Sequence, residues 1–457
     1  MRCRWGPTSR RLRSNEIEST LRSLYSSAPN SISLRLHASV GSLCSSCLHI
    51  EPRKEKTVLG SATLIIATKS QNLWTPGFVL LCCAQFFGSA QHALLQPTFP
   101  LYITSLGGTA FEVGLVLACF AATSVVFRPL IGGWADSWSE TGVLICGLLL
   151  LSAAVIFCFI PYAEATMFAN ALRGLGWAGL SAAGYSLLAL SAPPARRGEA
   201  SGFYSGVQAS GTILLPAVAL WLIDAPFGGF HTVFIVAIVL AALGAGTGAI
   251  RTRYALEPTH KPHAAPSATW WKEVLSVLDR EVILASVLSF SSHVTFPALT
   301  SFLVLYAREI GIDNIGWFYV ATGTTSLLAR PVLGKVSDQI GRRRALLACF
   351  ILQALALLAL AFASSLLELV IPGTLYMLGL AMASATTLAI AMEQAKPERR
   401  GRAMATFSIA LPLSNGVGAL ICGSLVQGFG FFWMYVAVAA IAAVGLLITI
   451  AQRAHLK

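Results

Sequence analysis

The chain has 457 residues, of which 55% are apolar and only 11% are charged, and its mean hydropathy is +0.70. This balance excludes a soluble globular domain and indicates a membrane protein. The formal net charge is +12, but the basic residues collect in residues 1–70 and at the ends of apolar segments. The charge therefore reflects membrane topology and a basic tail, and we expect no nucleic-acid partner.

The first 70 residues are rich in Arg and Ser and hold only four acidic side chains. Two interpretations stay open. The composition is similar to that of an organelle targeting peptide, and it is equally that of a disordered tail, or of upstream sequence included by a wrongly chosen start. Residues 1–70 are therefore assigned to no folded domain.

From Trp74 onward, apolar segments follow one another, each of about 20 residues, the length that crosses a bilayer core of roughly 30 Å. The sequence predicts an all-α membrane protein with an N-terminal six-helix bundle at 71–250, a cytoplasmic linker with an interfacial helix at 251–280, and a C-terminal six-helix bundle at 281–457. The twelve predicted spans lie near 74–99, 111–134, 142–161, 165–191, 201–224, 230–250, 282–306, 314–334, 345–364, 368–393, 403–426 and 430–452.

The basic residues also predict the orientation. Beyond the tail, nearly all Lys and Arg fall on one side of the predicted spans, with Arg173 inside a span and Arg308 on the other side. By the positive-inside rule, both termini face the cytoplasm, and we expect a multi-pass protein of the cell membrane. The cysteines lie in apolar spans or in a lone CxxC of the tail, so we expect no metal site and no cofactor.

Two related polar loops follow the second and eighth predicted spans. One reads RPLIGGWADSWSETG from Arg128, and the other reads RPVLGKVSDQIGRRR from Arg330. A constant offset aligns their arginines, prolines, glycines and aspartates, which indicates a duplicated six-helix unit. Two parallel halves related by an axis along the membrane normal are typical of a transporter with a central site between them.

The later loop resembles motif A of the major facilitator superfamily, G-x-x-x-D-x-x-G-R-[RK], and the resemblance extends over about residues 72–452, most closely to the drug and sugar efflux branch. In that family the loop acts as a latch on the cytoplasmic side, which implies the same role here. The earlier copy departs from the pattern, with Ser139, Glu140 and Thr141 where glycine and basic residues are usual. The implied gating residues are Gly132, Asp136, Arg330, Gly334, Asp338, Gly341, Arg342 and Arg343.

Arg173 lies deep in the fourth predicted span, on one helical face with Asn170 and Trp177. An ionisable side chain at that depth normally faces a cavity and has a partner. The position resembles motif B, whose Arg the family associates with proton coupling or anionic substrates. A purely structural Arg bonded to backbone carbonyls is the alternative.

The fifth predicted span resembles motif C, the antiporter motif of the family, in part. Gly202, Gly211 and Pro216 keep its spacing, but Leu215, Ala219 and Leu220 replace expected glycines. Gly and Pro in this pattern favour a bent, closely packed helix.

In this architecture spans one, four, seven and ten line the central cavity. Spans one and seven carry polar side chains at helical spacing, and the two histidines among them ionise near neutral pH. The alternative for each histidine is a buried, hydrogen-bonded residue of the helix core. No acidic residue lies deep in a predicted span. The candidate cavity residues are Gln85, Ser89, His92, Gln96, Asn170, Arg173, Trp177, Ser289, His293 and Thr300; the proton-coupling candidates are Arg173, His92, His293 and Glu393.

These features predict a secondary transporter that moves a small organic solute by alternating access, as an exporter coupled to proton antiport. An uptake carrier or symporter of the same fold and a non-transporting membrane receptor are the alternatives. No nucleotide loop, metal-spaced cluster or nucleophile motif favours an enzyme. The expected partners are the solute, protons and the lipid bilayer, and we expect a monomer.

Overall fold

The computed structural model describes residues 73–193, 196–254, 280–395 and 400–452. The tail and the predicted interfacial helix, within 255–279, lie outside these ranges. Of four predicted latch residues, Asp136, Arg330, Gly334 and Asp338, only the backbone is described. All regular elements in the described ranges are helical.

The first half contains seven α-helices and one 3-10 turn, which together make six spans. α5 begins with a capping box, because Thr109 and Glu112 each bond the other's backbone amide. The second span is bent by 46° between α5 and α6, where Pro129 opens α6. The elements are α4 (Pro76–Ser105), α5 (Ala110–Val126), α6 (Arg128–Ser137), α7 (Glu140–Ala154), η1 (Val155–Phe159), α8 (Ala163–Ser191), α9 (Arg197–Asp224) and α10 (Phe230–Arg251).

The second half differs from the prediction in its first span. Its first span is not continuous, since α12 ends at His293 and the chain continues through a π-helical turn. Its last two spans share the label α17 but are separated, near the predicted boundary, by a break at Gly430, whose φ of +83° favours glycine. The elements are η3 (Arg280–Val282), α12 (Ile283–His293), η4 (Ala298–Phe302), α13 (Leu303–Glu309), α14 (Gly316–Ile340), α15 (Arg342–Ala361), α16 (Leu366–Gln394) and α17 (Arg400–Ala451).

The twelve predicted spans are confirmed. In the described part of the chain, eight helical segments are long and apolar enough to cross a membrane, or nine with the bent pair α5 and α6. One of these segments belongs to α17 and holds two spans. α8 and α14 are also long enough, with 29 and 25 residues, but they are more polar.

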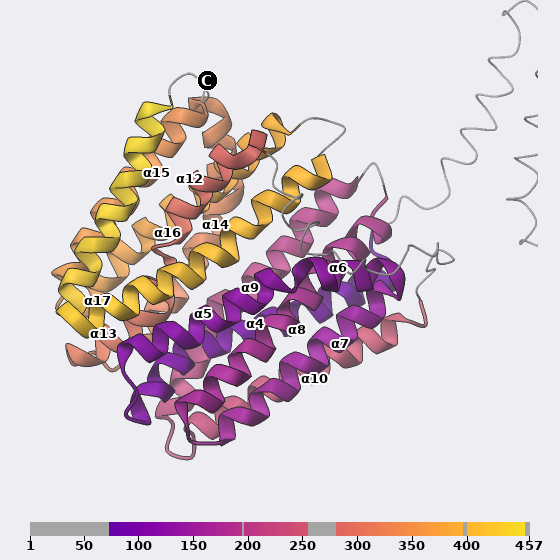
Figure 1. Cartoon of the computed structure of the whole chain (residues 1–457), viewed down its shortest axis with the longest axis horizontal. Helices are drawn as coiled ribbons and strands as arrows, with labels where there is room; N and C mark the ends of the chain where they lie inside the picture. Colours follow the sequence, from indigo (N-terminus) through magenta and orange to yellow (C-terminus); the bar gives the residue numbers. More distant parts are fainter. Residues whose placement is uncertain (1–72, 194–195, 255–279, 396–399, 453–457) are drawn as a thin grey trace, which may run out of the picture. The chain divides into compact units, whose positions relative to one another are not determined.

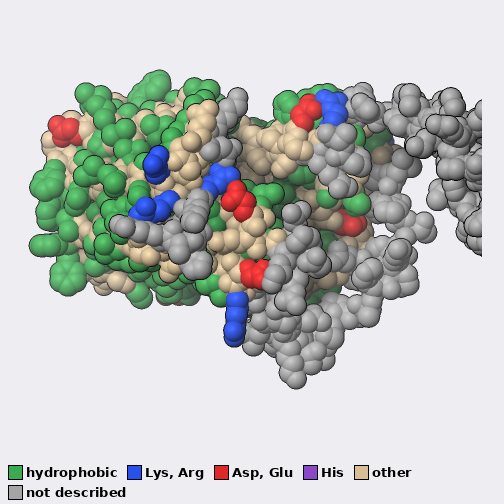
Figure 2. All heavy atoms as spheres, turned by 90° about the horizontal axis from the view of Figure 1, so that it is seen from above, with side chains coloured by type: hydrophobic (Ala, Val, Ile, Leu, Met, Phe, Trp, Pro, Cys, Tyr) green, Lys and Arg blue, Asp and Glu red, His purple; other side chains and the backbone are tan. Residues whose placement is uncertain are grey.

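The two halves lie side by side, with α4–α10 in indigo to magenta and α12–α17 in orange to yellow (Figure 1). α5 packs on α17, and α9 packs on α14. The visible face in Figure 2 is mainly hydrophobic with few charged side chains, and outward-facing Leu243, Leu355 and Leu447 are exposed. Such a surface suits lipid contact.

Among the described residues, the hydrophobic core is shared by the two halves on one side of the molecule. We call the side where α4 begins and α17 ends the termini side, and the opposite side the far side. On the far side one cluster joins both halves, from Phe99 and Tyr102 to Phe302 and Tyr435. On the termini side the cores are separate, around Leu144 in the first half and around Phe350 in the second. The described core therefore closes the molecule on the far side.

Candidate functional site

Arg173 is buried inside the first half, with 2% of its surface exposed. Its guanidinium donates to Asn170 Oδ1 at 2.5 Å and to Gln91 Oε1 at 3.2 Å, and it lies over the rings of Phe99 and Phe120. All of these partners are amide oxygens or aromatic faces. None of them is a carboxylate that would neutralise the positive charge. A cation held this way in a membrane protein is costly and indicates a role beyond packing.

The two amides are themselves held in place. Asn170 Nδ2 donates to the carbonyl of Val116 at 2.8 Å, and Gln91 Nε2 donates to that of Leu151 at 3.2 Å. Each amide therefore turns its oxygen toward Arg173. The network ties α4, α5, α7 and α8 together.

His92 extends this network toward side chains that are half-buried. Its ring stacks on Phe120 at 4.8 Å and lies 4.6 Å from the ring of Trp177. Its Nδ1 atom is buried and has no hydrogen-bond partner among the described residues. Phe120 therefore contacts both the imidazole of His92 and the guanidinium of Arg173. Gln96 lies one helical turn further along α4 and is half-buried.

Gln85 and Ser89, also predicted to line the cavity, lie elsewhere. Each is 2% exposed. Tyr204 of α9 donates to Gln85 Oε1 at 2.7 Å, and Gln85 Nε2 donates to Ser89 Oγ at 3.1 Å. In this conformation the pair joins α4 to α9. Gly211 of the motif C-like pattern packs on the same stretch of α4, with its ideal Cβ position 3.1 Å from the amide nitrogen of Ala90.

His293 is the corresponding residue of the second half, and it is 7% exposed. Its Nδ1 lies 2.8 Å from the carbonyl oxygen of Ser289, and its Nε2 lies 3.0 Å from Ser384 Oγ of α16. Thr300 is half-buried in the π-helical turn, where its carbonyl accepts a hydrogen bond from Tyr319 at 3.0 Å. The two histidines therefore have different surroundings, although they occupy equivalent helices.

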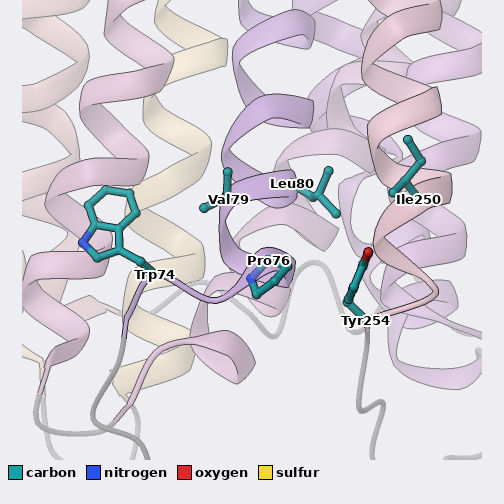
Figure 3. Close-up of a pocket in the computed structure, with 6 residues that line it drawn as sticks. All are labelled: Trp74, Pro76, Val79, Leu80, Ile250 and Tyr254. Carbon is teal, nitrogen blue, oxygen red and sulfur yellow. The ribbon is translucent and has the colours of Figure 1, made fainter.

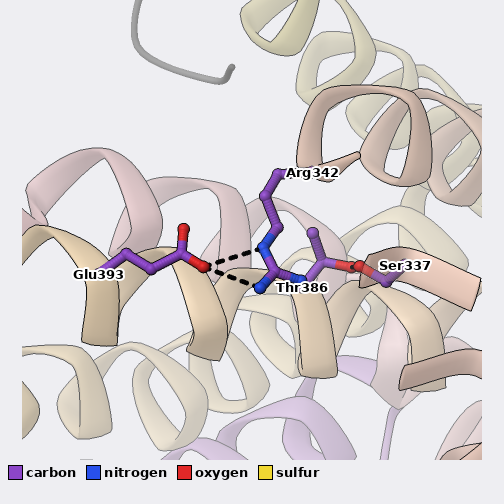
Figure 4. Close-up of polar contacts among 4 residues, drawn as sticks. All are labelled: Ser337, Arg342, Thr386 and Glu393. Carbon is purple, nitrogen blue, oxygen red and sulfur yellow. Dashed lines mark hydrogen bonds and ion pairs between the residues drawn. The ribbon is translucent and has the colours of Figure 1, made fainter. Parts of the chain in front are cut away.

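The second polar loop is bonded within its own half. Arg342, at the start of α15, pairs with Glu393 of α16 at 2.8 Å, and Ser337 of α14 bonds Thr386 of α16 at 2.7 Å (Figure 4). Gly341 makes the turn between α14 and α15 with a φ of +87°, which explains why glycine is needed there. Glu393 is thus 57% exposed on the termini side, away from the Arg173 network.

The remaining gating and hinge candidates make fewer contacts. A Cβ added to Gly132 or Gly202 would meet nothing within 4 Å. The Nε atom of Arg343 is buried and has no hydrogen-bond partner among the described residues. Pro216 lies inside α9, where it removes one helical hydrogen bond.

Polar and aromatic contacts reinforce the closed far side. Arg308 of α13 pairs with Asp224 at the end of α9 at 2.7 Å. Trp221 of α9 lies 5.8 Å from Trp317 of α14, ring to ring. Both contacts join the two halves.

Replacing Asp224 by asparagine will weaken the far-side closure slightly. The pair is about half exposed, so its loss costs at most about 1 kcal/mol, or roughly fivefold in the equilibrium between closed and open far sides. Nitroxide labels at Phe227 and Asn314, in a cysteine-free background, will report a larger population of long distances. Glu164→Gln, which removes a far-side carboxylate of α8 outside this pair, is the control. Equal distance distributions for both variants would contradict the role.

An apolar groove of about 400 Å³ lies at the termini side of α4 and α10, away from this network (Figure 3). It is lined by Trp74, Pro76, Val79, Leu80, Ile250 and Tyr254. Apart from one indole and one hydroxyl, these side chains offer no polar group. The groove is therefore a poor site for a polar solute.

Several residues of the network were not predicted from the sequence. Gln91, Phe99 and Phe120 hold Arg173, and Ser384 holds His293. Gln91 directly precedes His92, so it falls on another face of the same helix. Its only sequence signal is that it is one of several polar side chains between Gln85 and Gln96.

Comparisons with known proteins agree with this architecture. The family model of the Major Facilitator Superfamily matches residues 81–319 and 282–455. The chain belongs to the Major Facilitator Superfamily. It is therefore a multi-pass membrane protein and a secondary transporter of small molecules rather than an enzyme.

The relatives include efflux pumps. The chain is 25% identical over 392 residues to the multi-drug resistance efflux pump PmrA of Streptococcus pneumoniae serotype 4, covering 83% of this chain and 96% of PmrA. It is 25% identical over 389 residues to the multidrug resistance protein MdtG of Klebsiella pneumoniae, covering 80% and 91%. The solved structure of the nucleoside transporter NupG has the same fold, with a TM-score of 0.66, 15% identity, and coverage of 84% and 100%.

Proposed function

We propose that this chain exports small amphiphilic organic solutes across a cell membrane by alternating access coupled to proton antiport. The observation that carries the proposal is its similarity to PmrA and MdtG over most of their length. The names of those relatives describe multidrug efflux or multidrug resistance. An aromatic and polar network around Arg173 supports a solute of mixed character.

We propose that the termini side is the cytoplasmic side, as the basic residues predict. The conformation then faces inward, since the shared core closes the far side and the cores of the termini side are separate. This is the state in which an exporter takes up its solute.

The half-buried face of His92, Trp177 and Gln96 is the proposed solute contact in the first half. Arg173 acts from behind it as a fixed positive charge, with Phe120 between the guanidinium and His92. Thr300 extends the proposed contact into the second half. Gln85 and Ser89 have a positioning role between α4 and α9.

We infer that the second polar loop is a latch that is disengaged in this conformation. Arg342 is held by Glu393 of its own half, and this contact must change if Arg342 is to bond the first half when the termini side closes. The ion pair with Arg342 supports a role for Glu393 in this latch rather than in the central site.

The test is solute-dependent proton movement in proteoliposomes. The panel contains the aromatic cation ethidium, the aromatic anion aminohippurate and the neutral sugar glucose. Export driven by an opposing proton gradient is the expected result for at least one of them. Solute and proton movement in the same direction would support the uptake symporter, and binding without flux would support the receptor; either result contradicts the proposal.

A further inference from the structure

The two pseudo-equivalent histidines differ in what their ring nitrogens meet. His92 lies between aromatic rings, and its buried Nδ1 meets no acceptor among the described residues. His293 has an oxygen within 3.0 Å of each ring nitrogen. From this difference we propose that His293 is the proton-binding residue of the transport cycle and that His92 stays neutral. The inference rests on the proposed proton-coupled export.

The hydrogen bonds around His293 suit an imidazolium. The carbonyl of Ser289 can only accept, so His293 Nδ1 carries a hydrogen. When a second proton binds, Nε2 donates to Ser384 Oγ, and the Ser384 hydroxyl donates to the carbonyl of Leu380 at 2.8 Å. Without that proton, the single hydroxyl hydrogen of Ser384 can serve either Nε2 or Leu380, but not both. Binding or release of the proton therefore changes the contact between α12 and α16.

The position of His293 along its helix adds a second reason. His293 is the last residue of α12, where the free carbonyl ends of the helix favour a positive charge. The chain then leaves the α-helical path and enters the π-helical turn at Ala298. A charge that appears and disappears here acts on the break in the span, which is the part of that span able to bend.

Four elements pack against α12, and they bring few charged groups to its end. α15 bonds Ser292 of α12 through Gln353 at 2.7 Å and carries its arginines, Arg342 to Arg344, at its first residues. η3 carries Arg280 and Glu281 at the opposite end of α12. α16 carries Glu368 and Glu393 near its two ends, and Glu393 is paired with Arg342. Residues 403–451 of α17 include no Asp, Glu, Lys, Arg or His. The uncharged titratable groups on these elements are Cys349 of α15, Tyr376 of α16, which bonds Thr295, and Cys422 and Tyr435 of α17.

His92, in contrast, is beside a permanent cation. Arg173 and His92 both contact the ring of Phe120, and the hydrogen-bond partners of Arg173 are neutral amides. A second positive charge at His92 would be repelled across a low-dielectric site. The fixed charge and the switchable charge are thus placed in different halves of the transporter.

The direct test measures protonation itself. The chain is labelled with nitrogen-15 at its histidines and placed in lipid nanodiscs, and the ring signals are assigned by their loss in His293→Gln and His92→Gln. We expect the His293 signal to change between about pH 5 and 8 and the His92 signal to stay that of a neutral ring. Ser384→Ala should shift the His293 midpoint. A His293 signal that is constant over this range overturns the inference, whatever transport shows.

Transport then separates coupling from solute movement. Solute exchange at equal pH on both sides requires no net proton movement, whereas accumulation against a gradient does. The assay uses whichever of ethidium, aminohippurate and glucose the unmutated chain exchanges. In His293→Gln, the rate of exchange should stay within about twofold of that of the unmutated chain. Accumulation of the solute driven by a pH difference should fall at least tenfold. The exposed His231, at the start of α10, supplies the control His231→Gln. Full proton-driven accumulation in His293→Gln overturns the inference, while failure of the unmutated chain to exchange any solute contradicts only the proposed function.

Discussion

Replacing Arg173 by leucine will lower transport by more than tenfold and will also lower the melting temperature. The substitution leaves Gln91 Oε1 and Asn170 Oδ1 buried without their donor, and each such orphaned oxygen costs about 1–3 kcal/mol. The two amides and the backbone carbonyls that orient them belong to four helices, α4, α8, α5 and α7, so the substitution destabilises the packing of the first half. Flux in proteoliposomes and thermal unfolding in detergent measure the two effects.

Arg173→Lys separates the charge from the shape of the side chain. Lysine keeps the charge, but an ammonium cannot bond two amide oxygens in a plane while stacking on Phe99 and Phe120. We therefore expect a smaller loss of transport than for leucine, with a melting temperature between those of the leucine variant and the unmutated chain. If the leucine variant had unmutated stability and flux, Arg173 would have neither role.

The fold could be predicted from the sequence because a membrane span needs only length and apolar composition. Twelve such segments and two matching loops define the two-bundle architecture before any contact is known. Length and composition alone do not predict the break after His293, since Val294 to Pro297 fit a continuous apolar span. The sequence signal for the break is Pro297, which lacks the amide hydrogen that would bond the carbonyl of His293 in an unbroken α-helix.

The candidate site was predicted only in part, for a geometric reason. Helical spacing groups residues that share a face, such as Asn170, Arg173 and Trp177, and the structure places these three around one network. Spacing does not say which neighbouring helix meets that face. Gln91 and Phe120 come from α4 and α5, and Gln85 turns toward α9 instead.

Replacing Gly423 by alanine will slow transport about tenfold by holding the two halves apart on the far side. A Cβ at this position would lie 2.5 Å from the carbonyl oxygen of Ala110 and 3.2 Å from the Cα atom of Gly114. Both are backbone atoms of α5, which cannot rotate away as a side chain can, so α5 and α17 must separate. Overpacking of this kind costs about 1–3 kcal/mol, or roughly 5- to 150-fold in a conformational equilibrium.

The α5 to α17 contact belongs to the closed far side. The overpacking therefore raises the free energy of the conformation described here. We expect the labels at Phe227 and Asn314 to report mainly long distances in Gly423→Ala, a larger change than Asp224→Asn produces. Gly246→Ala is the matched control, since a Cβ on that glycine of α10 would meet nothing within 4 Å. Alanine has a higher helix propensity than glycine, so slower transport cannot result from a loss of helical structure. Unchanged distances and flux in Gly423→Ala would show that close contact of α5 and α17 is not needed to close the far side.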